Sequence, residues 1–179
     1  MGDTVGSPSD PVTTEDESLR FDYHIESHAK VLSERVNPYY VSGYVDGEGC
    51  FTVSFSPRSK LKVKWEVRPS FSVSQNADRA ETLFQLVKYF GCGSIRPDRS
   101  DKTLKYEVRS INNLIDNIIP HFEKYPLQSS KQKDFTYFAD ICRRVYQGMH
   151  LLPKGLAKLQ IDALKMNPSG KRRYKTFSL

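Results

Sequence analysis

The spacing of apolar residues changes partway along the chain and marks where a helix gives way to strands. Residues 38–46 place Tyr40, Val41, Tyr44 and Val45 at helical spacing. Asn37 and Pro38 are a typical helix start, because asparagine caps free amides and proline fits the first turn. Gly47 and Gly49 follow the apolar run and end the helix.

From Cys50 onward the apolar residues recur at every second position. Residues 50–59 place Phe51, Val53 and Phe55 between serine and threonine, and residues 62–75 continue the alternation from Val63 to Val73. A period of two is typical of a strand with one buried face. We therefore predict two long strands joined by a turn at residues 57–60.

The rest of the chain repeats this order. Residues 77–90 are predicted as a helix stopped by Gly91, and residues 93–100 and 102–110 as a second hairpin. Helices are expected over 111–122, 129–149 and 156–166, with Pro126 and Pro153 as breakers. The fold class is α+β, in the order αββαββα with additional C-terminal helices. The inward aromatic residues are interpreted as core and not as base-stacking platforms: Trp65, Phe71, Phe84 and Phe90.

Charge is distributed unevenly along the 179 residues, whose net charge is +6. Residues 1–34 hold eight acidic and two basic residues, a net charge of −6, which leaves +12 for the remainder. We expect an acidic, partly disordered N-terminal extension over 1–36, one folded domain over 37–168 and a basic tail over 169–179. The extension could fold over the domain, shield its basic face or act as a linker.

Composition also bears on location and on metal binding. No stretch approaches the roughly 20 apolar residues of a membrane span, and the N-terminus lacks a secretory signal pattern. We expect a soluble intracellular protein without a membrane partner. Three widely spaced cysteines form no CxxC pair, and the four histidines have no ligand spacing, which argues against a zinc site or a disulfide framework.

The outward positions of the predicted strands and turns form a polar, cationic face. A two-stranded ribbon with such a face fits the major groove of double-stranded DNA, although antiparallel sheets often have one ordinary solvated face. The candidate DNA-binding residues there are Ser54, Ser56, Arg58, Lys60, Lys62, Lys64, Glu66, Arg68, Ser70, Ser72, Ser74, Arg96, Arg99 and Lys105.

The stretch VSGYVDGEG, residues 41–49, resembles the motif of the LAGLIDADG homing endonucleases. That motif is a helix ending in a small residue, Gly, two apolar residues, an acid, Gly, an acid and Gly. Ser42 through Gly49 follow it, with Val41 in place of the usual leucine. The resemblance includes the order αββαββα with a saddle-like antiparallel sheet, over about residues 38–150, and makes 37–168 an endonuclease domain.

The resemblance implies roles for individual residues. One motif per chain implies a homodimer in which two motif helices pack through Ser42, Gly43, Asp46 and Gly47. Catalytic roles are implied for Glu48, for Gln75 at the end of the second strand and for Lys131, with Lys133 as the alternative to Lys131. Arg79 is a candidate phosphate contact. Asp46 is interpreted as holding the helix end through a hydrogen bond, with direct metal binding as the alternative.

The implied chemistry requires a divalent cation. Paired Glu48 carboxylates repel unless a cation lies between them, and Mg²⁺ suits carboxylate and Gly47 carbonyl oxygens. We expect about two or three Mg²⁺ per dimer, with Mn²⁺ or Ca²⁺ as substitutes for binding, and no small-molecule cofactor.

The implied function is a staggered double-strand cut in a long, roughly palindromic DNA site. The host compartment would be an organelle (chloroplast or mitochondrion) or the bacterial cytoplasm, because such enzymes are encoded by mobile introns. Two alternatives stay open. One is an inactive family descendant that acts as an RNA maturase or DNA-binding regulator. The other is a generic basic protein with an accidental motif match.

Overall fold

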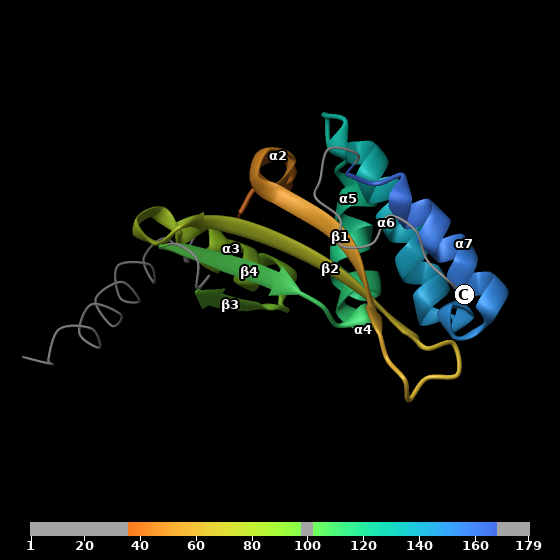
Figure 1. The fold of residues 1–179 in the computed structure, drawn as a ribbon. Coiled ribbons are helices and arrows are strands. Elements are labelled where there is room, and N and C mark those ends of the chain that lie inside the picture. The colour runs from red at the N-terminus through yellow and green to blue at the C-terminus, as the bar shows by residue number, and fades with distance from the viewer. Residues whose placement is uncertain (1–35, 98–101, 168–179) are drawn as a thin grey trace, which may run out of the picture.

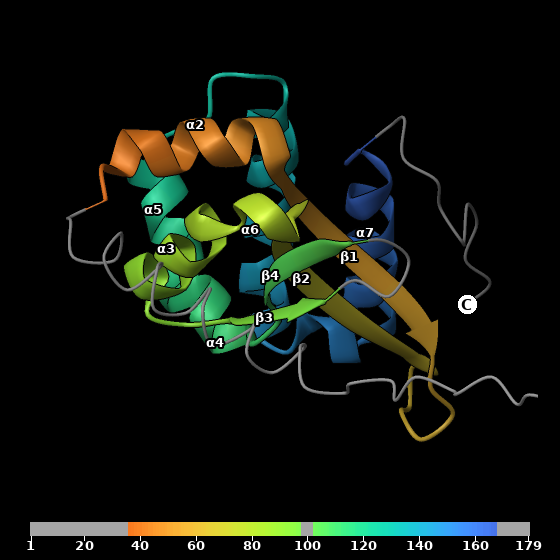
Figure 2. The same ribbon diagram turned by 90° about the vertical axis from the view of Figure 1, so that its left-hand side faces the viewer.

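The computed structural model describes residues 36–97 and 102–167, so the predicted extension up to residue 35, Arg99 and the tail lie outside the described residues. The motif forms helix α2 (Pro38–Glu48), and the Asn37 side chain accepts a hydrogen bond of 2.9 Å from the Tyr39 amide. Strand β1 (Gly49–Pro57) follows without a loop (Figure 2). A Cβ on Gly49 would lie 2.4 Å from Val45 Cγ1, so this direct junction requires glycine.

Four antiparallel strands form one sheet in the order β1-β2-β4-β3. The other three are β2 (Trp65–Asn76), β3 (Ser94–Pro97) and β4 (Thr103–Val108). Both predicted hairpins are present, and the mixed α+β architecture is confirmed. Pro69 lies in β2 opposite Val53 of β1, beyond the stretch of β2 that pairs with β4. Its missing N–H therefore costs no hydrogen bond between β2 and β4.

The turn between β1 and β2 is longer than predicted. The Arg58 amide donates to the Lys64 carbonyl and the Lys64 amide donates to the Leu61 carbonyl, at 2.8 and 2.9 Å. Lys64 has φ of 60°, a left-handed conformation that ends strand geometry. The placement of Lys62 and Lys64 on the second strand was therefore wrong, because both belong to this closed turn.

The helices follow the expected order with shifted ends. A 3-10 turn, η1 (Ala77–Arg79), precedes α3 (Glu81–Phe90), and the next helical segment comprises α4 (Ile111–Asn113), the π-turn η2 (Leu114–Ile118) and α5 (Ile119–Lys124). The C-terminal part contains α6 (Lys131–Tyr146), the 3-10 turn η3 (Met149–Leu151) and α7 (Pro153–Leu164). None of the helices in the described part of the chain has the length and apolarity needed to cross a membrane.

One face of the sheet carries the hydrophobic core. Phe51 is 1% exposed, and its ring centroid lies 5.2 Å from those of Phe71 and Phe138. Phe122 of α5 packs edge-on against the same ring, at 5.4 Å. Helices α5, α6 and α7 form a layer beside β1 and β2 (Figure 1). The alternate strand positions, which carry the serines and charged residues, therefore face away from the core.

Candidate active site and nucleic-acid interface

Helix α2 has one buried face and one open face. Val41 and Val45 are fully buried against the core. Gly43 and Gly47 are exposed, and a Cβ added at either position would meet nothing within 4 Å. Small residues on an exposed helix face allow another helix to approach closely. The open face around the two glycines is therefore suited to helix packing.

Ser42 does not belong to that open face. Its side chain is 4% exposed, and its hydroxyl donates to the Tyr125 carbonyl at 2.7 Å. The same oxygen lies 3.2 Å from Nε2 of the buried His121. The Ser42 side chain is therefore used within its own subunit, and a contribution of this position to a dimer interface stays a prediction.

Asp46 is also bound within the subunit. Its Oδ2 accepts hydrogen bonds of 2.9 Å from the amides of Gln128 and Ser129, and the Ser129 hydroxyl donates to Oδ1. Burial opposes ionisation, but these donors hold the pKa of Asp46 below its usual value. Both oxygens hold the loop before α6 against the end of α2. The Asp46 carboxylate is thus engaged within its own subunit, and its place in a dimer interface stays a prediction.

Lys131 joins α6 to the end of the motif helix. It is the first residue of α6, and its Nζ donates to the carbonyls of Val45 and Gly47, at 2.9 and 3.3 Å. Burial lowers the pKa of Lys131, and the nearby Asp46 carboxylate partly opposes that change. Lys133 is exposed, and no hydrogen bond within the described residues joins its side chain to the motif helix. Lys131 is therefore the lysine in contact with the motif.

Glu48 lies at the same end of the helix. Its side chain is exposed and makes no hydrogen bond or ion pair with any residue in 36–97 or 102–167. The Glu48 carboxylate is therefore unpaired within this part of the chain, and it lies next to the Gly47 carbonyl, which Lys131 binds. Both groups offer oxygen atoms that could bind a ligand at the edge of the sheet.

Gln75 connects β2 to the motif helix. It has the same strand parity as Phe71 and Val73, so its side chain lies on the helix-facing side of the sheet. Its Nε2 donates to the Tyr44 hydroxyl at 3.0 Å, and its Oε1 accepts from the Asn76 amide. Arg79 lies beyond it in η1, exposed, with an ion pair of 3.6 Å to Asp78.

One subunit supplies some of the oxygen ligands that a hard divalent cation prefers. The Glu48 carboxylate and the Gly47 carbonyl are oxygen donors of the kind that Mg²⁺ prefers. A carbonyl has two lone pairs, so Gly47 can serve Lys131 and a cation together. Among the described residues, however, no three His, Cys, Asp or Glu side chains form a group that could hold a metal. At this end of α2 the oxygen donors within the described residues are thus the Glu48 carboxylate and the Gly47 carbonyl.

The open sheet face carries most of the predicted DNA-binding residues in cross-strand rows. Ser54 lies opposite Arg68, Ser56 opposite Glu66, and Ser74 lies beside Lys105, which pairs with Arg96. Ser72 is on the same face but only 5% exposed. Lys60, Lys62 and Lys64 project from the turn beyond the strands, where Lys64 Nζ donates to the Ser59 carbonyl at 3.0 Å.

Glu66 is a bound acceptor and not a free one. Both its oxygens lie 2.9 Å from Arg58 Nη1, and Arg68 also donates to it. These hydrogen bonds, led by that of Arg68, hold the pKa of Glu66 below its usual value. Any contact of Glu66 with a base would therefore compete with two arginines.

The sequence-based list missed Glu107 on the same face. It is 8% exposed, and it accepts hydrogen bonds from Ser70 Oγ at 3.1 Å, Arg96 Nε at 3.2 Å and Arg109 Nη2 at 3.1 Å. Burial opposes ionisation, but these three donors keep the pKa of Glu107 below its ordinary value. Its position two residues after Lys105 puts it on the outward face, a signal that the alternation already contained.

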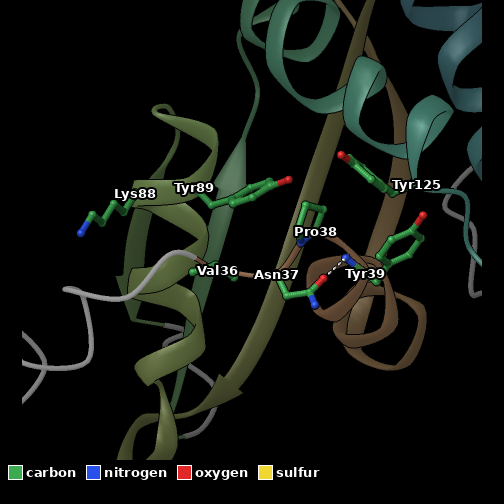
Figure 3. A pocket seen from close by; sticks show the side chains of 7 residues that line it. All are labelled: Val36, Asn37, Pro38, Tyr39, Lys88, Tyr89 and Tyr125. Carbon is green, nitrogen blue, oxygen red and sulfur yellow. Dashed lines mark hydrogen bonds between the residues drawn. The ribbon is translucent and has the colours of Figure 1, made fainter.

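A cavity of about 770 Å³ lies at the other end of the motif helix from Glu48 (Figure 3). It is lined by Val36, Asn37, Pro38, Tyr39, Lys88, Tyr89 and Tyr125. Among the residues that the structure describes, this lining includes no carboxylate. The oxygen donors named above, the Glu48 carboxylate and the Gly47 carbonyl, lie at the opposite, carboxyl end of α2.

Known proteins resemble this chain in sequence and in fold. A family model described as LAGLIDADG endonuclease matches residues 41–142. The probable intron-encoded endonuclease 2 of Neurospora crassa is 29% identical over 144 residues, covering 80% of this chain and 32% of the relative. The chain thus spans about a third of the length of the first curated relatives that it matches.

Two solved structures have the same fold. The homing endonuclease I-TnaI superposes with a TM-score of 0.71 and 35% identity, over 75% of this chain and 90% of that one. I-SmaMI bound to uncleaved DNA target in the presence of calcium ions gives a TM-score of 0.73 and 31% identity, over 78% of this chain and 47% of that one.

Proposed function

Because the chain belongs to the LAGLIDADG endonuclease family, we propose that it is a homing endonuclease that cuts both strands of a specific DNA site. The observation that carries the proposal is the meeting of Glu48, the Gly47 carbonyl and Lys131 where the motif helix reaches the sheet. A basic residue and available oxygen donors at the edge of a cationic sheet suit hydrolysis of a phosphodiester. The relatives named intron-encoded make a mobile intron the expected genetic setting.

The active form is a homodimer. The exposed Gly43 and Gly47 allow two motif helices to pack together, which would bring the two Glu48 carboxylates near the dimer axis. The coverage of the solved structures supports this arrangement, since the chain corresponds to 90% of I-TnaI but only 47% of I-SmaMI. A dimer of this chain would thus match one I-SmaMI chain in extent.

Mg²⁺ would be held by Glu48 and the Gly47 carbonyl of both subunits, and when bound it supplies charge neutralisation at the phosphate and an activated water. Lys131 places a positive charge beside these donors and would stabilise negative charge developing on the scissile phosphate. Gln75 is held by Tyr44 and keeps one further amide hydrogen and one further oxygen lone pair for orienting water. Arg79, exposed beyond Gln75, is suited to contact a neighbouring phosphate.

Each sheet would lie in the major groove of one half-site, with its outward side chains at the base edges. Two-fold symmetry of the protein then requires a roughly palindromic target, and a pair of active sites at the axis gives a staggered cut. The arginines and lysines around the sheet would bind phosphates and position the strands.

The decisive experiment is selection of cleaved sites from a randomised double-stranded library in Mg²⁺. We expect one long, approximately palindromic consensus, no product in EDTA, and binding without cleavage in Ca²⁺.

Glu48→Gln should abolish cleavage of the selected site and retain specific binding. Asp116→Asn, which removes an exposed carboxylate from η2, is the matched control and should cut normally. Specific binding with no Mg²⁺-dependent product would instead indicate a non-cleaving DNA-binding regulator.

A further inference from the structure

Glu107 is an unusual residue for a face that binds a polyanion. It is buried in the centre of the open sheet face, between Ser72 of β2 and Ser94 of β3 in the strand register. A carboxylate there repels DNA phosphates, and its burial carries a desolvation cost unless donors compensate it. Three donors compensate it here: one hydroxyl and two guanidinium groups.

The two arginines keep much of their surface free while Glu107 holds them. The Arg96 and Arg109 side chains are 46% and 63% exposed, against 8% for Glu107. Arg96 is bound through Nε, so both of its terminal nitrogens remain available. Arg109 is bound through Nη2, which leaves its Nε and Nη1 available. The Glu107 carboxylate therefore orients both guanidinium planes from the sheet side and leaves the other N–H groups of each arginine free to donate.

Orientation of an arginine is what reading a base requires. A guanidinium reads guanine by donating to O6 and N7 together, which demands a fixed plane and a fixed approach. A free arginine samples many rotamers, and ordering it on binding costs affinity. A pair that is already held by a buried carboxylate has lost much of that freedom before DNA arrives.

Glu66 provides an internal comparison on the same face. It also binds two arginines, Arg58 and Arg68, but its side chain is 26% exposed and lies at the distal end of the strands. Exposed ion pairs are weak and rearrange readily. The two clusters thus share their residue types and differ in the burial of the acid, which shields the ion pairs of Glu107 from water more than those of Glu66.

We propose that Glu107 is a specificity-determining positioning residue, which holds Arg96 and Arg109 for reading guanines without itself touching DNA. This inference rests on the proposed binding of DNA by the sheet. The negative charge of Glu107 lowers the affinity of the sheet for nonspecific DNA. Its hydrogen bonds to Arg96 and Arg109 raise the discrimination between bases.

The test compares Glu107→Gln with Glu66→Gln, using the library selection for the consensus and titrations of the selected site and of random DNA for affinity. For Glu107→Gln we expect random DNA to bind about threefold more tightly, because one negative charge is lost. The ratio of specific to random affinity should fall by at least about fivefold, with preference lost at guanine positions. Glu66→Gln should raise random binding but leave those guanine positions unchanged. An unchanged ratio in Glu107→Gln, or equal changes in both variants, would overturn the proposal.

Two further variants keep the proposal testable if Glu107→Gln does not fold. Arg96→Gln and Arg109→Gln change exposed side chains, and each should remove preference at guanine positions. Where Glu107→Gln does fold, its combination with Arg96→Gln should lose much less guanine preference than the sum of the two single losses. Intact guanine preference in both arginine variants would refute the inference. A wild-type protein that binds all sequences equally would instead refute the proposed function.

Discussion

Acidification should destabilise the protein through His121, the histidine beneath the motif helix. The ring is 7% exposed and is contacted by two neutral hydroxyl groups, with Tyr89 Oη 3.0 Å from Nδ1 and Ser42 Oγ 3.2 Å from Nε2. Ser42 donates its hydrogen to the Tyr125 carbonyl, so it accepts from Nε2–H, and Nδ1 accepts from Tyr89. None of these hydrogen-bonding partners is a carboxylate that would stabilise a protonated ring.

Burial lowers the pKa of His121 to about 4 from an ordinary value of 6.5. Below pH 6.5 the unfolded chain therefore takes up a proton that the folded chain rejects, and stability falls until the pH reaches about 4. The difference between the two pKa values limits the total loss to about 3 kcal/mol, of which about 2 kcal/mol is lost between pH 8 and pH 5. The carboxylates with lowered pKa values, such as Asp46 and Glu107, lose their contribution to stability mainly below pH 5, outside the interval from pH 8 to pH 5.

Urea unfolding followed by fluorescence of the single tryptophan, Trp65, measures this loss at pH 8 and pH 5. Protein concentration must be fixed, because the proposed dimerisation would contribute to apparent stability. We expect His121→Gln to lose about 2 kcal/mol less than wild type over this interval. His150→Gln is the comparison variant, because burial also lowers the pKa of His150, so removing this histidine, which lies outside the motif contact, should take away its own share of the wild-type loss. A wild-type loss that His121→Gln reproduces in full would refute the reasoning.

Three further outcomes test the site. Gly43→Leu should leave the subunit folded, because its Cβ meets nothing within 4 Å, but should yield monomers by sedimentation and abolish cleavage. A stable, active dimer would contradict helix packing at this face. Lys131→Met should lower the single-turnover cleavage rate by about 100-fold or more while Lys133→Met stays near wild type, and equal rates would refute the assignment. Asp46→Ala should lower the free energy of unfolding by about 2 kcal/mol in urea titrations, against little change for exposed Asp116→Ala.

The sequence was sufficient for the elements whose signals are local. The Asn37 cap, the helical spacing after it and the alternation that starts at Phe51 each depend on neighbouring residues, and all three are present in the structure. The turn before β2 shows the limit of such signals. Val63 continues the alternating pattern, yet a left-handed Lys64 and short-range hydrogen bonds end the strand there.

Contacts between distant segments were the part that sequence spacing could not supply. Ser42 has the small size expected of an interface residue, but His121 and Tyr125 lie about eighty positions away in the chain and engage it from inside. The strand parity of Glu107 places it on the outward face, but its proposed role depends on a hydrogen bond from Arg96 of the neighbouring strand. Parity places a side chain on a face without revealing which partner occupies its hydrogen-bonding groups.

The two acids of the motif illustrate how helix geometry separates their roles. Residues two apart on a helix do not share a face, whereas residues four apart do. Asp46 therefore aligns with Ser42, and the segment from Tyr125 to Ser129 binds both of them. Glu48 aligns instead with Tyr44, the partner of Gln75. The spacing thus directs one carboxylate to hold the subunit together and leaves the other at the open end of the helix. Asp46 and Glu48 are not interchangeable, because exchanging their roles would require rotating the helix by half a turn.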